Sequence, residues 1–145
     1  LHHIQRRDFA TILHTLRLEF PHVALFLGGG QGIIVASLAP LRASRARTAA
    51  LESQQTFLET VPQKRPLMSL FDDLLVENQG LDRFLEESAS RAGRSLDDLV
   101  STDENLYLEY ATPRGNVLPW SAREVLVSQL KHFRDEQAVA RMIAP

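Results

Sequence analysis

Cysteine is absent from the 145 residues of this chain. This absence excludes disulfide bonds, thiolate catalysis and zinc sites built on cysteine. It is compatible with a reducing cytoplasm, where we expect the chain to be located. No apolar run approaches the roughly 20 residues of a membrane-spanning helix, and the N-terminus lacks the pattern of a signal peptide. We therefore expect no membrane span within the chain.

An excess of charge of either sign is also absent. The 16 Lys and Arg residues nearly balance the 18 Asp and Glu residues, so the net charge is −2. A strongly basic surface is the usual mark of nucleic-acid binding, and we expect no nucleic-acid partner. The length, with 44% hydrophobic and 23% charged residues, is typical of one globular domain. Because the chain begins with Leu1 rather than Met, we expect it to be part of a longer polypeptide.

Motifs of metal sites and of nucleophilic catalysis are missing as well. None of the five histidines forms an i, i+4 pair, and neither HExxH nor GxSxG occurs. The adjacent carboxylates lack the alternating spacing of a calcium-binding loop. We therefore predict no metal site and no catalytic residue in this chain.

What the chain does have is a glycine-rich stretch, FPHVALFLGGGQGIIVAS, at residues 20–37. A phosphate-binding loop needs a helix directly after its glycines, because the free N–H groups at the start of the helix meet the anion. Here Ile33, Ile34 and Val35 follow, and β-branched residues favour a strand. We predict a β-hairpin with strands at 22–27 and 32–38.

A helix is expected before this hairpin. Asp8 suits its N-cap or first turn, and Pro21 ends it because a proline pushes the preceding residue out of the helical region. Apolar residues between these two positions recur at helical spacing and form one stripe. They are Phe9, Ile12, Leu13, Leu16 and Phe20.

From residue 41 onward the apolar pattern is mainly helical. It predicts a helix over 46–61 and a second helix over the stripe at 67–75, which Gly80 breaks. A third, short helix is expected from Leu81 to near Gly93.

Capping signals mark two further helices. Ser95 with Asp98 resembles a capping box ahead of a short helix. Ser121 with Glu124 has the same spacing at the start of the last helix, so we expect a capping box there too.

The polar segment between these helices is expected to be a turn, and Asp103 is expected to close it. Residues 106–111 follow and alternate in part between apolar and polar. We predict either a strand or an extended docking segment over this range.

Three segments together give a resemblance to a known family. They are EFPHV at 19–23 with the glycine hairpin, STDENLYLEYATPR at 101–114, and LFDDLLVENQGLDRFL at 70–85. They resemble segments of bacterial spermidine synthase-like proteins, the polyamine aminopropyltransferases, which include long members with membrane-spanning N-terminal parts. The two more specific segments place the resemblance within residues 1–40 and 101–116.

The resemblance implies a fold and a division of the chain. The isolated chain is expected to be α+β, and in the intact protein it would be the C-terminal part of a Rossmann-like, methyltransferase-type α/β fold. Residues 1–40 would supply a helix and an edge β-hairpin to that sheet. Residues 41–145 would form a mainly helical C-terminal region.

The reaction of this family is aminopropyl transfer from decarboxylated S-adenosylmethionine, the co-substrate, to an amine. In the family, the loop that binds the co-substrate and the aspartate that deprotonates the amine lie ahead of the matched segments. The resemblance therefore assigns no catalytic residue and no cofactor site to this chain. We expect the 145 residues alone to be non-catalytic.

The resemblance also suggests one wall of a substrate pocket. Gly29, Gly30 and Gln31 would lie along this wall, and Asp103 with Glu109 would offer anions to the ammonium groups of a polyamine. Typical members carry a tyrosine and a proline just before the Gly-Gln pair, where this chain has glycines. Either the acceptor differs, or the protein is a non-catalytic relative.

An alternative belongs to another class of protein. The chain can instead be a small α+β dimerisation or protein-docking module without enzymatic activity. A two-stranded hairpin alone is marginally stable, and its edge needs a partner. The expected partner is a second copy, which would give a homodimer, or an upstream Rossmann-like domain.

Overall fold

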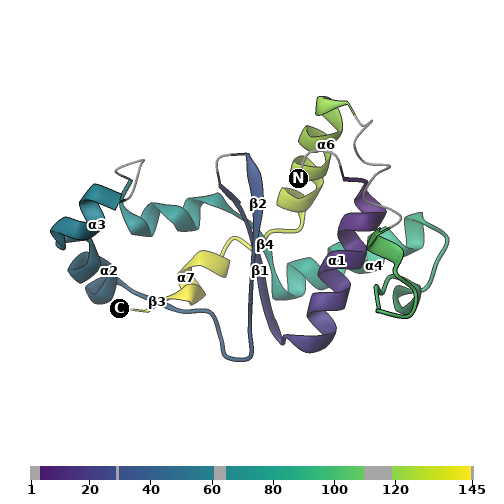
Figure 1. Cartoon of the computed structure of the whole chain (residues 1–145), viewed down its shortest axis with the longest axis horizontal. Helices are drawn as coiled ribbons and strands as arrows, with labels where there is room; N and C mark the ends of the chain where they lie inside the picture. Colours follow the sequence, from purple (N-terminus) through teal and green to yellow (C-terminus); the bar gives the residue numbers. More distant parts are fainter. Residues whose placement is uncertain (1–3, 29, 61–64, 110–118, 145) are drawn as a thin grey trace.

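The computed structural model describes residues 4–28, 30–60, 65–109 and 119–144. Within these ranges the chain is α+β, and a small sheet lies between two groups of helices (Figure 1). The strands are β1 His22–Gly28, β2 Gln31–Ser37, β3 Ala43–Ser44, β4 Leu74–Glu77 and β5 Ile143–Ala144. The α-helices are α1 Arg6–Glu19, α2 Arg45–Glu52, α3 Gln55–Thr60, α4 Asn78–Arg91, α6 Trp120–His132 and α7 Ala138–Met142, and the 3-10 helices are η1 Leu67–Asp73 and η2 Leu96–Asp98.

The central sheet has the strand order β2-β1-β4, and both pairs of strands are antiparallel. β1 and β2 pair without interruption from His22 opposite Ser37 to Gly28 opposite Gln31. This pairing confirms the predicted hairpin. Because β1 has β4 on its other side, only β2 of the hairpin lies at an edge of the sheet.

The helix predicted over 67–75 is wrong, because η1 ends at Asp73 and β4 follows. All four residues of β4 are buried. A short apolar run that is buried on both faces has no periodicity that separates a strand from a helix. In the pairing with β1, Val76 lies opposite Leu25 and Leu74 lies opposite Phe26, so Leu75 is an extra, bulged residue.

Gly80 does not break a helix, contrary to the prediction, because α4 begins at Asn78 and continues through it. Its lack of a side chain serves close packing instead. A Cβ at Gly80 would lie 2.3 Å from the carbonyl oxygen of Phe133, the residue directly after α6. Gly80 therefore lets the start of α4 approach the end of α6.

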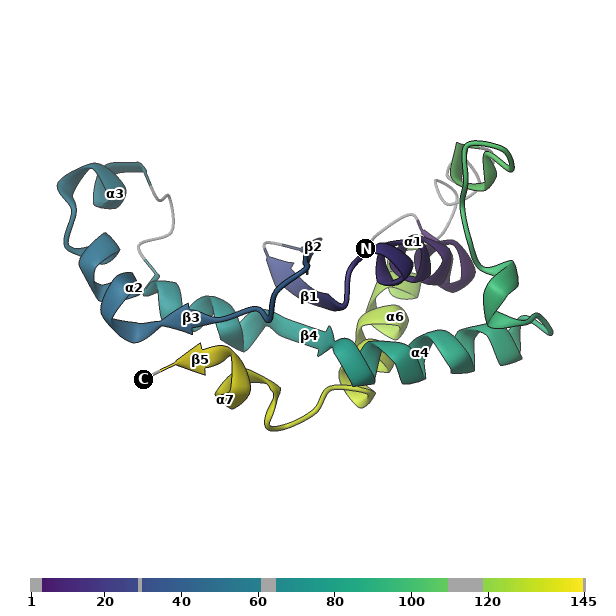
Figure 2. The ribbon, with the colours of Figure 1, turned by 90° about the horizontal axis from the view of Figure 1, so that it is seen from below.

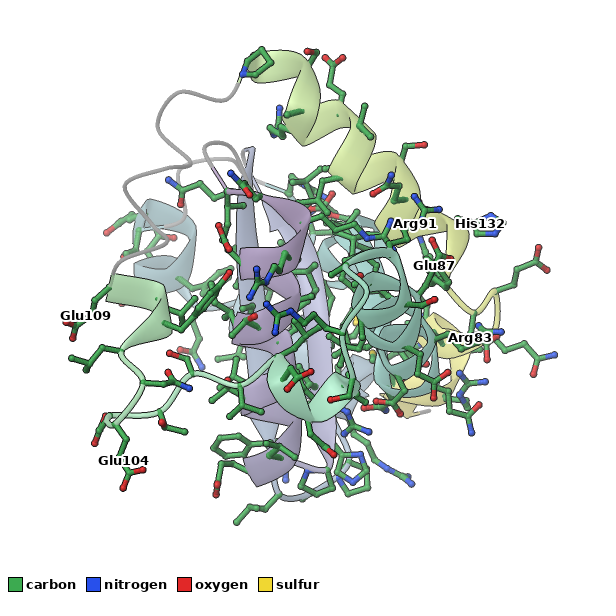
Figure 3. All side chains as sticks on the ribbon, turned by 90° about the vertical axis from the view of Figure 1, so that its right-hand side faces the viewer. Arg83, Glu87, Arg91, Glu104, Glu109 and His132 are labelled. Carbon is green, nitrogen blue, oxygen red and sulfur yellow. The ribbon has the colours of Figure 1, made fainter. Side chains whose placement is uncertain are left out.

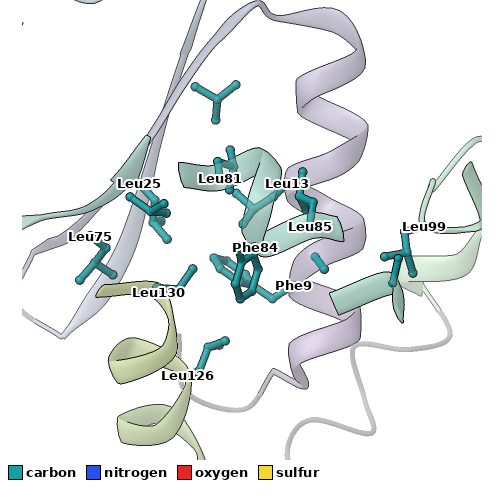
Figure 4. Packing of buried hydrophobic residues seen from close by; sticks show 14 residues of the cluster. Phe9, Leu13, Leu25, Leu75, Leu81, Phe84, Leu85, Leu99, Leu126 and Leu130 are labelled. Carbon is teal, nitrogen blue, oxygen red and sulfur yellow. The ribbon is translucent and has the colours of Figure 1, made fainter. Parts of the chain in front are cut away.

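Helices α1, α4 and α6 cover one face of the sheet, which we call the inner face (Figures 1 and 4). The side chains that meet here come from all three helices, from the strands and from the segment after η2. The main members of this cluster are Phe9, Leu13, Leu25, Leu75, Leu81, Phe84, Leu85, Leu99, Leu126 and Leu130. Burial of one such side chain contributes about 1.5–3 kcal/mol. Because this cluster contains more buried side chains than the cluster on the opposite face, it is the main core of the described structure.

The opposite face of the sheet, the outer face, has a smaller cluster. Leu74 and Met142 are buried there, and the rings of Phe26 and Phe71 meet edge to face with centroids 6.2 Å apart. Helices α2 and α3 and the 3-10 helix η1 extend from this side of the sheet (Figure 2). The parallel pairing of β3 with β5 joins the start of α2 to the end of α7.

Of three further predicted helices, one is confirmed and two need correction. The helix before the hairpin is confirmed as α1, which ends at Glu19 ahead of Pro21. The single helix predicted over 46–61 is divided into α2 and α3. Ser121 does not cap the last helix as expected, because α6 begins at Trp120 and its N-cap is Pro119.

The capping box at Ser95 and Asp98 is confirmed. Both of its hydrogen bonds are present, although the helix behind it, η2, is only three residues long. The box therefore fixes the direction in which the chain leaves α4 and returns toward α1.

Candidate functional site

The predicted pocket wall begins at the turn between β1 and β2. Gly29 lies outside the described residues. Gly30 has a φ of +90°, a conformation that favours glycine, and Gln31 is exposed at the start of β2. A Cβ at Gly30 would lie 3.4 Å from Nη2 of Arg123, so this end of the hairpin lies close to α6.

Asp103 does not close the turn that contains it, contrary to the prediction. The closing residue is Asn105, whose Oδ1 accepts hydrogen bonds from the backbone N–H groups of Thr102 and Tyr107. Asp103 itself is exposed. The side chains of Asp103 and Asn105 can both make such local bonds, because both are short and polar. In this turn Asn105 makes them.

The segment predicted at 106–111 is not a strand where it is described. Residues 107–109 form a helical turn, and 110–111 lie outside the described residues. Glu109, at the end of this turn, is exposed.

The two halves of the predicted wall do not meet. The hairpin turn and the segment 101–109 lie on different sides of α1 in Figures 1 and 2. Figure 3 shows Glu104 and Glu109 directed away from the body of the molecule. The structure therefore places Gly30 next to Gln31 but does not bring Asp103 or Glu109 to them.

A hollow of about 310 Å³ does lie beside the hairpin, between Leu27 of β1 and α6. Its charged lining residues are Arg123, Glu124 and Lys131, two basic residues to one acidic residue. This balance does not favour the ammonium groups of a polyamine. None of the described residues predicted for the pocket wall lines this hollow.

The segment 101–109 is attached to α1 by Tyr107. Its hydroxyl donates a hydrogen bond of 2.6 Å to Oδ1 of Asp8, a residue that is only 4% exposed. The guanidinium of Arg7 lies 5.0 Å from the centre of the same ring, within the range of a cation–π contact. These contacts hold Tyr107, and with it the segment 101–109, against α1.

A partly buried arginine connects the three helices of the inner face. Arg6 of α1 donates hydrogen bonds to Ser88 and Glu87 of α4 and to Gln129 of α6. Burial and the nearby charge of Arg91 lower the pKa of Arg6, and Glu87 opposes this shift. Figure 3 shows Glu87 and Arg91 together on one side of the molecule. The donors and acceptors of this group bind one another, so we assign the group to the structure rather than to a ligand.

The described residues contain no group of three histidine or acidic side chains that could hold a metal ion. Among the same residues, no helix has the length and apolarity needed to cross a membrane.

A small polar cavity of about 220 Å³ lies on the outer side of the sheet, lined in part by Arg42, Glu77 and Arg141. Glu77 is 5% exposed, and Arg141 donates a hydrogen bond of 2.8 Å to it and another of 2.8 Å to Asp135. The hydrogen bond to Asp135 and, to a smaller extent, the hydrogen bond to Glu77 raise the pKa of Arg141. The buried carboxylate of this cavity is therefore already paired.

A larger, apolar cavity of about 400 Å³ lies between the outer face of the sheet and η1. Its polar groups are few. The carboxylate of Asp73 is held by Arg65 at 2.8 Å, and the hydroxyl of Thr48 donates to backbone carbonyls of α2 and its N-cap. Arg42 lines both this cavity and the polar one. Sequence reasoning missed this cavity, because its lining comes from segments that are distant along the chain.

No protein-family model, no curated protein and no solved structure matches this chain.

Proposed function

We propose that this chain is the C-terminal region of a spermidine synthase-like protein, in which it extends the sheet of an upstream methyltransferase-like domain. In this role it closes one side of the domain and does not supply the catalytic groups. The observation that supports the proposal most directly is the free edge of β2. Among the described strands, β2 pairs only with β1, so the backbone groups on its other side are available to a further strand.

The composition of β2 strengthens this argument. Its sequence, QGIIVAS, contains neither a charged residue nor a proline. Edge strands that must stay unpaired usually carry lysine, proline or a bulge to prevent sheet extension. An uncharged strand of seven residues that has no proline and pairs with β1 without a bulge is therefore suited to accept a partner strand.

The partner in this proposal is a strand of the upstream domain. The order of elements at the N-terminus, a helix followed by an antiparallel hairpin, is the order that the resemblance to spermidine synthase-like proteins implies. The parent reaction would be transfer of an aminopropyl group from decarboxylated S-adenosylmethionine to an amine. Such a reaction depends on holding two substrates in position and on a base that removes the amine proton. The chain would contribute to the positioning.

Amide hydrogen exchange tests the free edge. In the isolated chain, the β2 amides that face β1 should exchange slowly, and those on the open side should exchange fast. In a longer polypeptide that includes the residues encoded before Leu1, all central β2 amides should be slow. Amides of β1 serve as the control, because β1 has a strand on both sides and should be protected in both samples.

Two outcomes would overturn this proposal. Alternating protection that persists in the longer polypeptide would show that no upstream strand pairs with β2. Uniform protection in the isolated chain, together with the mass of a dimer, would identify a second copy as the partner and favour a dimerisation module.

Activity assays test the assignment of the chemistry. The isolated chain should transfer no aminopropyl group from decarboxylated S-adenosylmethionine to a diamine, whereas the longer polypeptide should do so. Transfer by the isolated chain would contradict its non-catalytic role. Inactivity of the longer polypeptide would contradict the parent reaction but not the pairing of β2.

A further inference from the structure

We propose that the outer side of the sheet binds a small amphipathic anion, a single-chain acyl carboxylate of medium length. The acyl chain would occupy the apolar cavity, and its carboxylate would lie against Arg42. This inference concerns a face of the sheet and not its edge, so it is independent of the function proposed above.

The apolar cavity has the size and lining of a ligand site. Its volume of about 400 Å³ lies at the lower end of the 300–1,000 Å³ that is typical of small-molecule sites. Its lining comes from strands β1 and β2, from helices α2, α7 and η1, and from the segment between β2 and β3. The main lining residues are Phe26, Ile33, Val35, Leu70, Phe71 and Met142.

The cavity exposes apolar surface to water. Ile33 of β2 is 50% exposed and Leu70 of η1 is 48% exposed, and both line the cavity. Covering such surface is favourable by about 25 cal/mol per Å². A hydrocarbon chain in the cavity would cover part of both side chains. The cavity is too small for a two-chain lipid, and a single acyl chain suits its volume.

Arg42 determines the expected charge of the ligand. It lines the apolar cavity and the polar cavity, and among the described residues its side chain has no hydrogen-bond or ion-pair partner. The carboxylates that line these cavities are already bound, Asp73 by Arg65 and Glu77 by Arg141. A guanidinium beside an apolar cavity, with no carboxylate of its own, is suited to bind a ligand carboxylate through charge-assisted hydrogen bonds.

The test compares three ligands that share a ten-carbon chain and differ in the head group: decanoate, decanol and decyltrimethylammonium. Each is titrated below its micelle concentration into the isotope-labelled 145-residue chain, and amide chemical shifts are followed. We expect saturable shifts at Gly28, Ile33 and Leu70. Decanoate should bind about tenfold more tightly than decanol, the size of one hydrogen bond to a charged group, and the cation should bind most weakly.

Two variants with the same change of charge separate the role of Arg42 from net charge. Arg42→Gln should reduce the affinity for decanoate to that for decanol and leave decanol binding unchanged. Arg47→Gln, at an exposed position of α2 that does not line the cavity, should leave the affinity for decanoate unchanged. A third variant, Val35→Trp, should fill the cavity and weaken decanoate and decanol alike.

Several results would overturn the inference. They are the absence of saturable binding, shifts confined to the inner face, equal affinity for the three ligands, and an equal effect of the two arginine variants. If Val35→Trp fails to fold, the comparison of Arg42→Gln with Arg47→Gln still decides, because both arginines are exposed and their replacement leaves the core intact.

Discussion

The hydroxyl of Tyr107 donates a hydrogen bond of 2.6 Å to the carboxylate of Asp8, 99 positions earlier in the chain. Asp8 lies in the first turn of α1, where the helix dipole favours a negative charge. Two further bonds support the same attachment. Ser101 donates its N–H to Thr15 Oγ1, and His14 Nδ1 donates to a backbone carbonyl after η2. Together these bonds place the segment 101–109 against α1.

Replacing Tyr107 with phenylalanine tests the contribution of this bond. We expect Tyr107→Phe to lower the free energy of unfolding by about 1.5–3 kcal/mol, because the buried carboxylate loses a hydrogen-bond donor. Urea denaturation monitored by circular dichroism measures this loss. Amides of 101–109 should also exchange faster in the folded state, since the segment loses its attachment.

The control for this variant lies in the same segment. Glu109 is exposed, and Glu109→Gln should change the free energy of unfolding by no more than about 0.5 kcal/mol. If Tyr107→Phe is as stable as the original chain and exchanges at the same rate, the bond does not fix the segment.

Gly80 provides a second prediction, in which helix propensity and packing oppose each other. An alanine inside a helix is favoured over glycine by about 1 kcal/mol, so propensity alone predicts that Gly80→Ala stabilises the chain. Packing predicts the reverse, because the new Cβ would lie 2.3 Å from the backbone oxygen of Phe133. We expect a loss of about 3 kcal/mol, which is typical of severe overpacking.

Gly93→Ala is the matched comparison, because Gly93 has open space around an added Cβ but a φ of +63°. It should cost about 1–2 kcal/mol through backbone strain alone. Thermal unfolding of both variants measures the difference. A Gly80→Ala variant that is more stable than the original chain would show that α4 and α6 separate at no cost.

The elements that the sequence predicts well are those with local signals. The hairpin follows from β-branched residues directly after glycines, and α1 follows from its apolar stripe and from Pro21. β4 has no such signal. It forms a strand because it pairs with Leu25 and Phe26 of β1, about 50 positions earlier, and its side chains are covered on both faces of the sheet. No local pattern in the sequence indicates that pairing.

The site was harder to predict than the fold for the same reason. The charge of Asp103 and Glu109 is suited to ammonium groups, but both side chains are exposed, and the structure does not bring them to the hairpin. The outer cavity has one signal in the sequence. β1 and β2 are apolar on both faces, with Phe26 and Ile33 on one and Leu25 and Ile34 on the other, and strands of this kind are usually covered on both sides.

The capping box at Ser95 gives a prediction about pH. The backbone N–H of Ser95 donates a hydrogen bond of 3.0 Å to Asp98, and this bond, with the nearby arginines, lowers the pKa of Asp98 below its ordinary value of 3.8. Since the unfolded chain then binds the proton more tightly, the carboxylate stabilises the fold above about pH 4. This contribution is lost as the pH falls through the lower, folded pKa.

The stability of the Asp98→Asn variant should therefore decrease less on acidification than that of the original chain. Unfolding free energies measured from about pH 5 down to pH 2 should fall less steeply than in the original chain. Asp97→Asn makes the same change of charge at the neighbouring exposed position and serves as the control. Equal slopes for the two variants would contradict the assignment to Asp98.

The pair of Arg141 and Glu77 gives the last prediction. Glu77 is 5% exposed and Arg141 is half exposed, with 2.8 Å between their charged groups. Removing the arginine leaves a buried carboxylate without its partner, so Arg141→Met should lower the free energy of unfolding measurably, but by less than the loss of a fully buried pair, because water screens the exposed guanidinium. Adding Glu77→Gln removes the unpaired charge, and the double variant should regain at least half of that loss. Urea denaturation at neutral pH measures all three chains. A double variant less stable than Arg141→Met alone would show that Glu77 stabilises the fold without the arginine.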